Sequence, residues 1–197
     1  MQCRRAIFYL ALSLVMILTA CSLTPSEQQV PTEVSLKRLT DTQAFGVGGR
    51  ISLQTLNSAD TAALRWRQDA PGQVVLTLSG PLGLQRTRLE QRGDQIFLQQ
   101  DGKMRRYDPQ QALYSQGFEW ALPLAELSWW LRGLAAPDQP STATHDRGQL
   151  VHLAQSGWSL DFEEYQRVDS LMLPRRIRFY REQVSGKILL KDWTLPL

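Results

Sequence analysis

From residue 46 onward, apolar and polar residues alternate with a period of two over most of the chain. This pattern is typical of strands with one buried face. Around Trp66, for example, Ala62, Leu64 and Trp66 alternate with Ala63, Arg65 and Arg67. The alternation predicts ten strands, at residues 47–55, 62–67, 74–79, 84–91, 95–100, 103–107, 149–155, 158–165, 173–181 and 187–195.

Short turns join the first six predicted strands. Pro71-Gly72, Arg92-Gly93-Asp94 and Asp101-Gly102 are turn sequences that separate consecutive strands. Connections of this length permit only antiparallel neighbours, because a parallel crossover needs a dozen or more residues. The chain is therefore expected to form an antiparallel sheet.

Three segments have apolar residues at helical spacing instead, at residues 36–44, 109–115 and 123–134. The third is predicted to be a helix from Leu124 to Leu134 with one apolar face. Residues 135–148 are rich in Pro, Ser, Thr and Asp and are predicted to form a loop. The apolar face of the helix consists of Leu124, Leu127, Trp130, Leu131 and Leu134.

A long antiparallel sheet with one apolar side curls around that side and needs a cover. We therefore predict a mainly β fold with a single curved antiparallel sheet and a helical cover on its concave face. Periodicity does not separate a filled core from an apolar cavity, so both interpretations stay open at this point. The residues expected on the concave face are Leu64, Trp66, Leu76, Leu78, Leu98, Trp158, Leu160, Phe162, Ile177 and Phe179.

The first 20 residues have the pattern of a secretory signal. Arg4 and Arg5 precede an apolar run over residues 6–18, which is shorter than the roughly 20 residues of a membrane-spanning helix. The following Leu18-Thr19-Ala20-Cys21 resembles the bacterial lipobox, and this resemblance implies lipidation of Cys21. An ordinary signal peptide with an incidental cysteine is the alternative. We expect a signal at 1–20, an acylated cysteine and flexible tether at 21–35, and one domain at 36–197.

Loss of the signal removes two arginines and no acid, which lowers the formal net charge from +3 to +1. A charge this small gives no support to nucleic-acid binding, which needs a clustered basic surplus. The two cysteines are also not expected to stabilise the fold. Cys3 leaves with the signal and Cys21 is expected to be acylated, so no disulfide is expected within the mature chain.

Catalytic signatures are missing from the sequence. There are two histidines, His145 and His152, without the spacing of a zinc site, and no nucleophile elbow, phosphate loop or dinucleotide motif. The acids Asp161, Glu163 and Glu164 are interpreted as a solvated strand face. We predict no enzyme activity, no metal and no cofactor. Several arginines also fall at outward strand positions, where contact with an anionic lipid or acidic partner is an open alternative: Arg86, Arg88, Arg105, Arg106, Arg175, Arg176 and Arg178.

One turn has an unusual composition. Leu82 lies at the tip of the segment Gly80-Pro81-Leu82-Gly83, where hairpin turns normally carry polar residues. A tight, proline-stiffened turn gives Leu82 no route back to the core, so we expect it to face solvent. Rigidly exposed apolar groups are often contact points for a membrane or a partner. The alternative is that Leu82 packs against a neighbouring loop.

Taken together, these segments resemble the LolA/LolB lipoprotein-localisation family, on the side of its outer-membrane receptors. The features that carry the resemblance follow one another in order along most of the mature chain. They are the lipobox with Ser22 after the cysteine, Gly46-x-Gly-Gly-Arg-Ile-Ser, Gly80-Pro81-Leu82-Gly83, Trp129 to Leu134, Ser156-Gly157-Trp158 and Lys191-Asp192-Trp193. The Arg-rich outer strands and the short Gly-Gly first strand depart from the family pattern.

The resemblance implies an open, incomplete β-barrel with a helical lid over an apolar cavity that holds acyl chains. It implies an outer-membrane receptor, facing the periplasm on its lipid anchor, that accepts lipoproteins from a soluble LolA-like periplasmic carrier. Leu82 maps to a protruding loop needed to place the cargo in the membrane. Leu127, Trp130 and Leu131 join the concave-face residues as cavity candidates. A monomer is expected, and the alternatives are a structural or assembly subunit of the outer membrane and a carrier of another apolar ligand.

Overall fold

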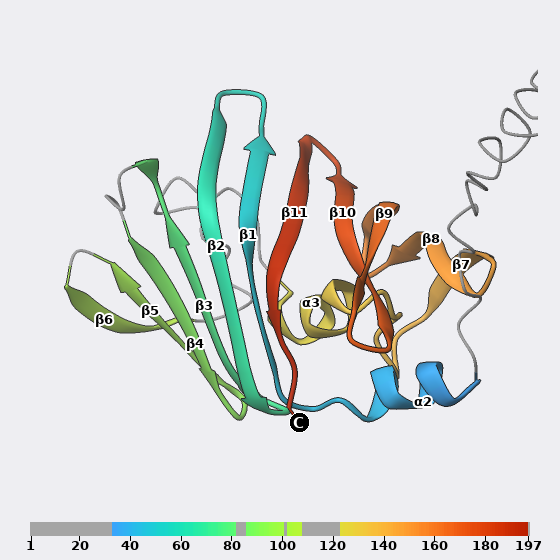
Figure 1. Ribbon diagram of the computed structural model, residues 1–197. Coiled ribbons are helices and arrows are strands. Elements are labelled where there is room, and N and C mark those ends of the chain that lie inside the picture. The colour runs from blue at the N-terminus through green and yellow to red at the C-terminus, as the bar shows by residue number, and fades with distance from the viewer. Residues whose placement is uncertain (1–32, 82–85, 101, 108–122, 197) are drawn as a thin grey trace, which may run out of the picture.

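The computed structural model describes residues 33–81, 86–100, 102–107 and 123–196. Within these residues the chain forms one large antiparallel sheet with two helices (Figure 1). Neither helix is long and apolar enough to cross a bilayer. The elements are α2 (Glu33–Asp41), β1 (Phe45–Gln54), β2 (Ala59–Ala70), β3 (Gln73–Ser79), β4 (Thr87–Arg92), β5 (Gln95–Gln100), β6 (Lys103–Tyr107), α3 (Leu124–Leu131), β7 (Ser141–Asp146), β8 (Gln149–Gln155), β9 (Trp158–Val168), β10 (Leu171–Arg181) and β11 (Val184–Thr194).

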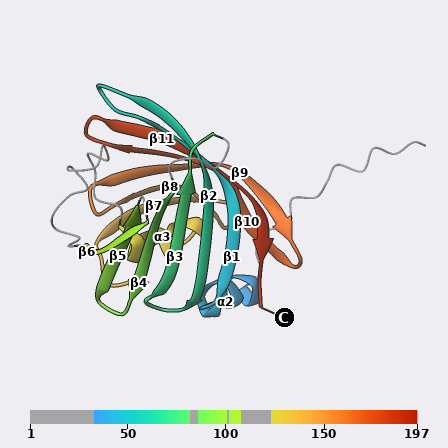
Figure 2. The same cartoon turned by 90° about the vertical axis from the view of Figure 1, so that its left-hand side faces the viewer.

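The strands form a single 11-stranded sheet in the order β6-β5-β4-β3-β2-β1-β11-β10-β9-β8-β7. Every neighbouring pair is antiparallel, and β6 and β7 are the outermost of the described strands. The sheet curves strongly, as expected from the twist of antiparallel strands, and does not close into a barrel (Figure 2). The mainly β, open half-barrel architecture is confirmed.

The predicted loop at 135–148 was wrong in part, because β7 (Ser141–Asp146) lies within it and raises the strand count from ten to 11. All six residues of β7 are exposed, so this edge strand has no apolar alternation to reveal it. Its threonines at 142 and 144 favour extended backbone. Arg147 and Gly148, both at positive φ, form the two-residue turn into β8.

Both described helices differ from their predicted limits. α2 begins at Glu33, inside the stretch expected to be a tether, and ends at Asp41 instead of residue 44. α3 ends at Leu131 instead of Leu134, because Gly133 adopts φ +77° and the N–H of Leu134 bonds to the carbonyl oxygen of Trp129. The helix predicted at 109–115 lies outside the described residues. Residues 84–85 of the predicted fourth strand also lie outside them, and β4 begins at Thr87.

The pairing of β1 with β11 joins the two halves of the sheet. These strands are far apart in sequence, and their register runs from Gly46 opposite Thr194 to Gln54 opposite Ser185 (Figure 1). Close approach at Gly49 makes this pairing possible, because a Cβ at that position would overlap the carbonyl oxygen of Leu189. Glycine at 49 is therefore a packing requirement of the junction.

The substitution Gly49→Ala should destabilise the fold by about 2–3 kcal/mol, because the added methyl forces β11 away from β1. Chemical denaturation monitored by tryptophan fluorescence measures the loss. Gly46→Ala is the matched control on the same strand, since a Cβ there would lie 3.5 Å from Thr194 Cβ, an ordinary contact. Equal stabilities for the two variants would contradict the packing requirement.

The core lies between the concave side of the sheet and α3. Strands from both halves contribute buried side chains to one continuous apolar cluster that includes Leu124, Leu127, Trp130 and Leu131 of α3. In Figure 2 the sheet arches over this helix. A second, smaller cluster joins Leu39 of α2 to β10. The curved sheet and α3 thus enclose one shared apolar space.

Candidate functional site

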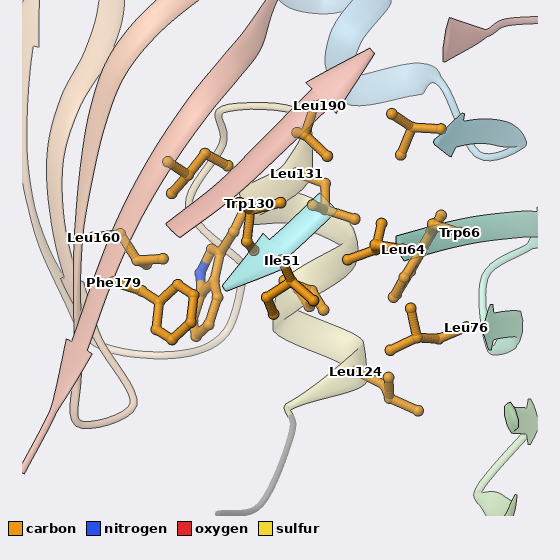
Figure 3. Packing of buried hydrophobic residues seen from close by; sticks show 14 of the residues in the cluster. Ile51, Leu64, Trp66, Leu76, Leu124, Trp130, Leu131, Leu160, Phe179 and Leu190 are labelled. Carbon is orange, nitrogen blue, oxygen red and sulfur yellow. The ribbon is translucent and has the colours of Figure 1, made fainter. Parts of the chain in front are cut away.

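An apolar void lies where α3 faces the centre of the concave surface. Its volume is about 40 Å³, and its walls come from both halves of the sheet, from α3 and from the residue before that helix. In Figure 3 the labelled side chains of the sheet, such as Leu64 and Phe179, converge on Trp130 and Leu131 of α3. The lining consists entirely of apolar residues: Ile51, Leu64, Leu76, Leu78, Pro123, Leu127, Trp130, Trp158, Leu160, Phe179 and Ile188.

All 13 side chains that the sequence marked as cavity candidates are buried in the core cluster around this void. Eight of them line it directly: Leu64, Leu76, Leu78, Leu127, Trp130, Trp158, Leu160 and Phe179. The other five, Trp66, Leu98, Leu131, Phe162 and Ile177, are buried in the same cluster without lining the void.

Sequence reasoning missed three lining residues, Ile51, Pro123 and Ile188. Ile51 and Ile188 lie opposite each other across the β1–β11 junction. Ile51 lies between Arg50 and Ser52, so the period-two pattern could have identified it, whereas Ile188 is followed by two leucines that hide the alternation. Pro123 gives no comparable signal, because its place beside the void depends on where α3 begins.

The void is small for a ligand site. Pockets that hold small molecules usually have volumes of about 300–1,000 Å³, whereas this void has about 40 Å³. A space of this size holds only a few atoms, so an extended apolar ligand enters only if α3 or the sheet moves. Such a movement would expose the lining residues as one continuous apolar surface.

Gln155 of β8 holds α3 and the chain that follows it. Its side-chain oxygen accepts hydrogen bonds from Trp130 Nε1 at 2.8 Å and from the Ala136 N–H at 2.9 Å. Its side-chain nitrogen donates to the carbonyl oxygens of Ala136 and Gln139, at 2.9 and 3.2 Å. Gln155 is buried, so these bonds replace the water that it lost on folding. They fix Trp130 in the wall of the void.

A buried arginine connects the end of α3 to α2. Arg132 Nη1 donates hydrogen bonds to the carbonyl oxygens of Leu39, in the last turn of α2, at 2.8 Å and of Thr42, just after that helix, at 2.6 Å. Its guanidinium also lies 4.5 Å from the ring centroid of Trp129. Burial lowers the pKa of Arg132 to about 10. The guanidinium is therefore still charged at neutral pH when it makes these contacts. Periodicity placed this residue in a helix but gave no sign of its burial.

The three acids considered as a carboxylate group are on the outer face of the sheet. Asp161 Oδ1 lies 2.8 Å from His152 Nδ1, Glu163 pairs with Arg178, and Glu164 Oε1 lies 2.6 Å from Arg176 Nη1. Each carboxylate therefore has a basic partner. Among the described residues, no group of three or more His, Cys, Asp or Glu side chains could hold a metal ion.

The turn that carries Leu82 leaves the sheet at the end of β3. Gly80 follows Ser79, the last residue of that strand, and Pro81 is exposed. Leu82, Gly83 and Cys21 lie outside the described residues, so their predicted roles stay predictions.

Comparison with known proteins assigns the chain to a family. The model of the family described as outer membrane lipoprotein LolB matches residues 43–193. The chain belongs to the LolB family. A LolB protein of Chromohalobacter salexigens is 31% identical over 194 residues, which cover 95% of this chain and 90% of the relative. Another, from Stutzerimonas stutzeri, is 34% identical over 151 residues, covering 75% of this chain and 72% of the relative.

The family match runs from before β1 to Trp193 in β11, and the relatives carry the name outer-membrane lipoprotein LolB. The chain is thus an outer-membrane lipoprotein of a lipoprotein-trafficking family, not an enzyme. A LolB protein of Pseudomonas aeruginosa is 28% identical over 94% of both chains.

Solved structures share the architecture at low identity. A DUF1329 family protein of Desulfovibrio piger has a TM-score of 0.57 and 8% identity, with 83% of this chain and 90% of that chain covered. A putative outer membrane lipoprotein-sorting protein domain of Vibrio parahaemolyticus has a TM-score of 0.54 and 10% identity, with 83% and 91% covered. At these identities the likeness shows the fold alone.

Replacing Gln155 with Leu should destabilise this LolB-family chain by about 3 kcal/mol, because Trp130 Nε1 and the Ala136 backbone groups would be buried without partners. Chemical denaturation gives the free energy of unfolding. The control is Gln95→Leu at the exposed start of β5, which we expect to change stability by less than about 0.5 kcal/mol. Equal stabilities of Gln155→Leu and the control would show that Gln155 does not position α3.

Proposed function

We propose that this protein is an outer-membrane receptor that accepts acylated lipoproteins from a soluble periplasmic carrier and inserts them into the membrane. The observation that carries the proposal is the void beneath α3, whose lining has no polar residue. Membership of the LolB family supports the trafficking role. Acyl chains of the cargo are the ligand that this chemistry fits.

The energetics explain why such a receptor needs an apolar interior. Burial stabilises a methylene by about 0.8 kcal/mol, so an acyl chain of some fifteen methylenes would cost on the order of 10 kcal/mol to expose to water. Transfer between two proteins without this cost requires that the acyl chain reaches an apolar surface of the receptor before it leaves that of the carrier. The concave face of the sheet supplies that surface.

The described contacts suggest how the space could open. Where α3 faces the void, it meets the sheet through apolar side chains, chiefly Leu127 and Trp130. An incoming acyl chain would replace these contacts with equivalent apolar ones, so separation of α3 from the sheet need not expose apolar surface. The driving force is then the difference in affinity between carrier, receptor and bilayer, and no nucleotide is needed.

Membrane delivery is assigned to the two features outside the described residues. Acylated Cys21 would hold the protein at the outer membrane, and Leu82 would contact the bilayer where cargo leaves. Gly80 and Pro81 follow the last residue of β3, so the turn leaves the sheet at the end of that strand. An apolar side chain at such a tip can enter the acyl region at low cost.

Acyl chains in the void should quench its tryptophans. A lipopeptide with brominated acyl chains should reduce the fluorescence contributed by Trp130 and Trp158, which line the void. In the double variant Trp130→Phe/Trp158→Phe, most of this quenching should disappear, by about fivefold or more, because close contact with bromine is then lost. Fluorescence titration with the lipopeptide measures the effect.

The control is Trp193→Phe, since Trp193 packs near α2 and does not line the void. Its quenching should match that of the unmodified protein. Equal quenching in all three proteins would place the acyl chains elsewhere.

The substitution Leu82→Glu should separate acceptance from delivery. A charge at the tip opposes entry into the bilayer, so insertion of cargo should fall by about tenfold or more, while uptake from the carrier stays unchanged. Transfer from loaded carrier and insertion into vesicles are measured separately, with Leu82→Met as the control. Normal insertion by Leu82→Glu would refute the role given to this turn.

A further inference from the structure

The outer face of the sheet differs in its charge pairing between the two halves. On β9 and β10, three arginines, at 175, 176 and 178, lie within ion-pair distance of Glu163 or Glu164. These three arginines are thus paired with neighbouring carboxylates. The half formed by β1 to β4 follows a different pattern.

On that half, the outer face has a hollow of about 600 Å³. Its floor includes Gly48, which has no side chain to fill it, and six cations project around it. The lining residues are Gly48, Gly49, Arg50, Ala63, Leu64, Arg65, Arg67, Val75, Thr77, Ser79, Arg86, Arg88, Lys191 and Asp192.

The strand register arranges three of these cations in one row. Lys191 lies opposite Gly48, Gly48 opposite Arg65, Arg65 opposite Thr77, and Thr77 opposite Arg88. Each cation is therefore separated from the next by a small residue, Gly48 or Thr77, at a spacing of about 10 Å across two strands. Arg50 lies two residues further along β1 on the same face. This arrangement leaves open gaps between positive groups.

Most of these cations have no acidic partner among the residues that the structure describes. Arg67 pairs with Asp69, and Arg88 pairs with Glu90. Within the described part of the chain, Arg50, Arg65, Arg86 and Lys191 form no ion pair. Asp192 is the one carboxylate in the lining. The hollow thus keeps a positive surplus, in contrast to the paired arginines of β10.

The hollow adjoins the turn that carries Leu82. Ser79 and Arg86, both part of its lining, flank that turn on its two sides. On the proposed function, the turn contacts the bilayer, and the nearest anions to the hollow are then lipid phosphates. Leu189, opposite Arg50 and 42% exposed, adds an apolar contact beside the cations.

We infer that this basic hollow binds the phosphate of a phospholipid headgroup. Guanidinium groups hold phosphate through charge-assisted, often bidentate hydrogen bonds. Several such contacts would hold the outer face of β1 to β4 against the headgroups while Leu82 enters the acyl region. The inference rests on the proposed function, which puts the bilayer at the Leu82 turn, and it adds the headgroup as a ligand.

Photo-crosslinking tests this site in the full-length acylated protein. A benzoylphenylalanine at Thr77, in the hollow between Arg65 and Arg88, is irradiated in vesicles that contain phosphatidylglycerol. We expect a phospholipid adduct detectable by mass. In Arg50→Gln/Arg65→Gln the adduct yield should fall about fivefold or more, since each cation near an anionic surface contributes to binding. Added salt should also lower the yield.

The matched control removes two arginines from the paired half, as Arg175→Gln/Arg176→Gln, and should keep the adduct. An equal loss in the control, a full yield in Arg50→Gln/Arg65→Gln, or an adduct to protein instead of lipid would each overturn the inference. Absence of a lipid adduct together with stabilisation by glycerol 1-phosphate would also overturn it, and would assign the hollow to a soluble phosphate.

The readout needs neither carrier nor cargo, so its failure can be told apart from failure of the receptor role. If Leu82→Glu blocked insertion while no lipid adduct formed at Thr77, the receptor would stand and the headgroup site would not. If the adduct formed while Leu82→Glu inserted cargo normally, the headgroup site would stand without the proposed role of the turn.

Discussion

The pairing of β1 with β11 is the constraint on which the rest of the molecule depends. Each half of the sheet is a series of neighbouring strands that could form locally, and among the described strands only this pairing joins strands from opposite ends of the domain. It sets Ile51 against Ile188 at the centre of the concave face. Without it, the two halves would have separate apolar faces and α3 would have no shared surface to cover. Gly49 matters because the junction requires close backbone approach there.

The way α3 is held suits a cover that can move. Its contacts around the void are apolar. Its polar attachments lie near its C-terminal end, where Trp130 Nε1 donates to Gln155 of β8 and Arg132 donates to the Leu39 carbonyl of α2. Ser128 adds a hydrogen bond to Gln68 Oε1 at 2.6 Å. Apolar contacts carry no directional requirement, so another apolar group can replace them without leaving buried donors unpaired. The polar attachments then determine which part of the helix stays in place.

Much of this architecture could be predicted from sequence, and the failures have physical causes. Alternation identified the concave residues because burial on one face of a strand leaves a period-two pattern, as around Trp66 and Leu160. The same test fails for β7, where both faces are exposed. It also fails for Arg132, whose burial depends on carbonyl groups about 90 residues away in sequence. Cavity volume could not be predicted, because it depends on how side chains from seven elements fit together.

The two faces of the strands β1 to β4 show how one pattern can serve two surfaces. The inward positions of β2, Leu64 and Trp66, join the apolar core, while the intervening Arg65 and Arg67 project into the outer hollow. Because the side-chain period of a strand is two, a shift of one residue would exchange these faces and bury the arginines. Correct register is therefore required for both surfaces at once. The turn after β3 then leaves the sheet beside the outer cations and at the end of a strand that lines the apolar void, so a membrane contact at that turn would lie next to both.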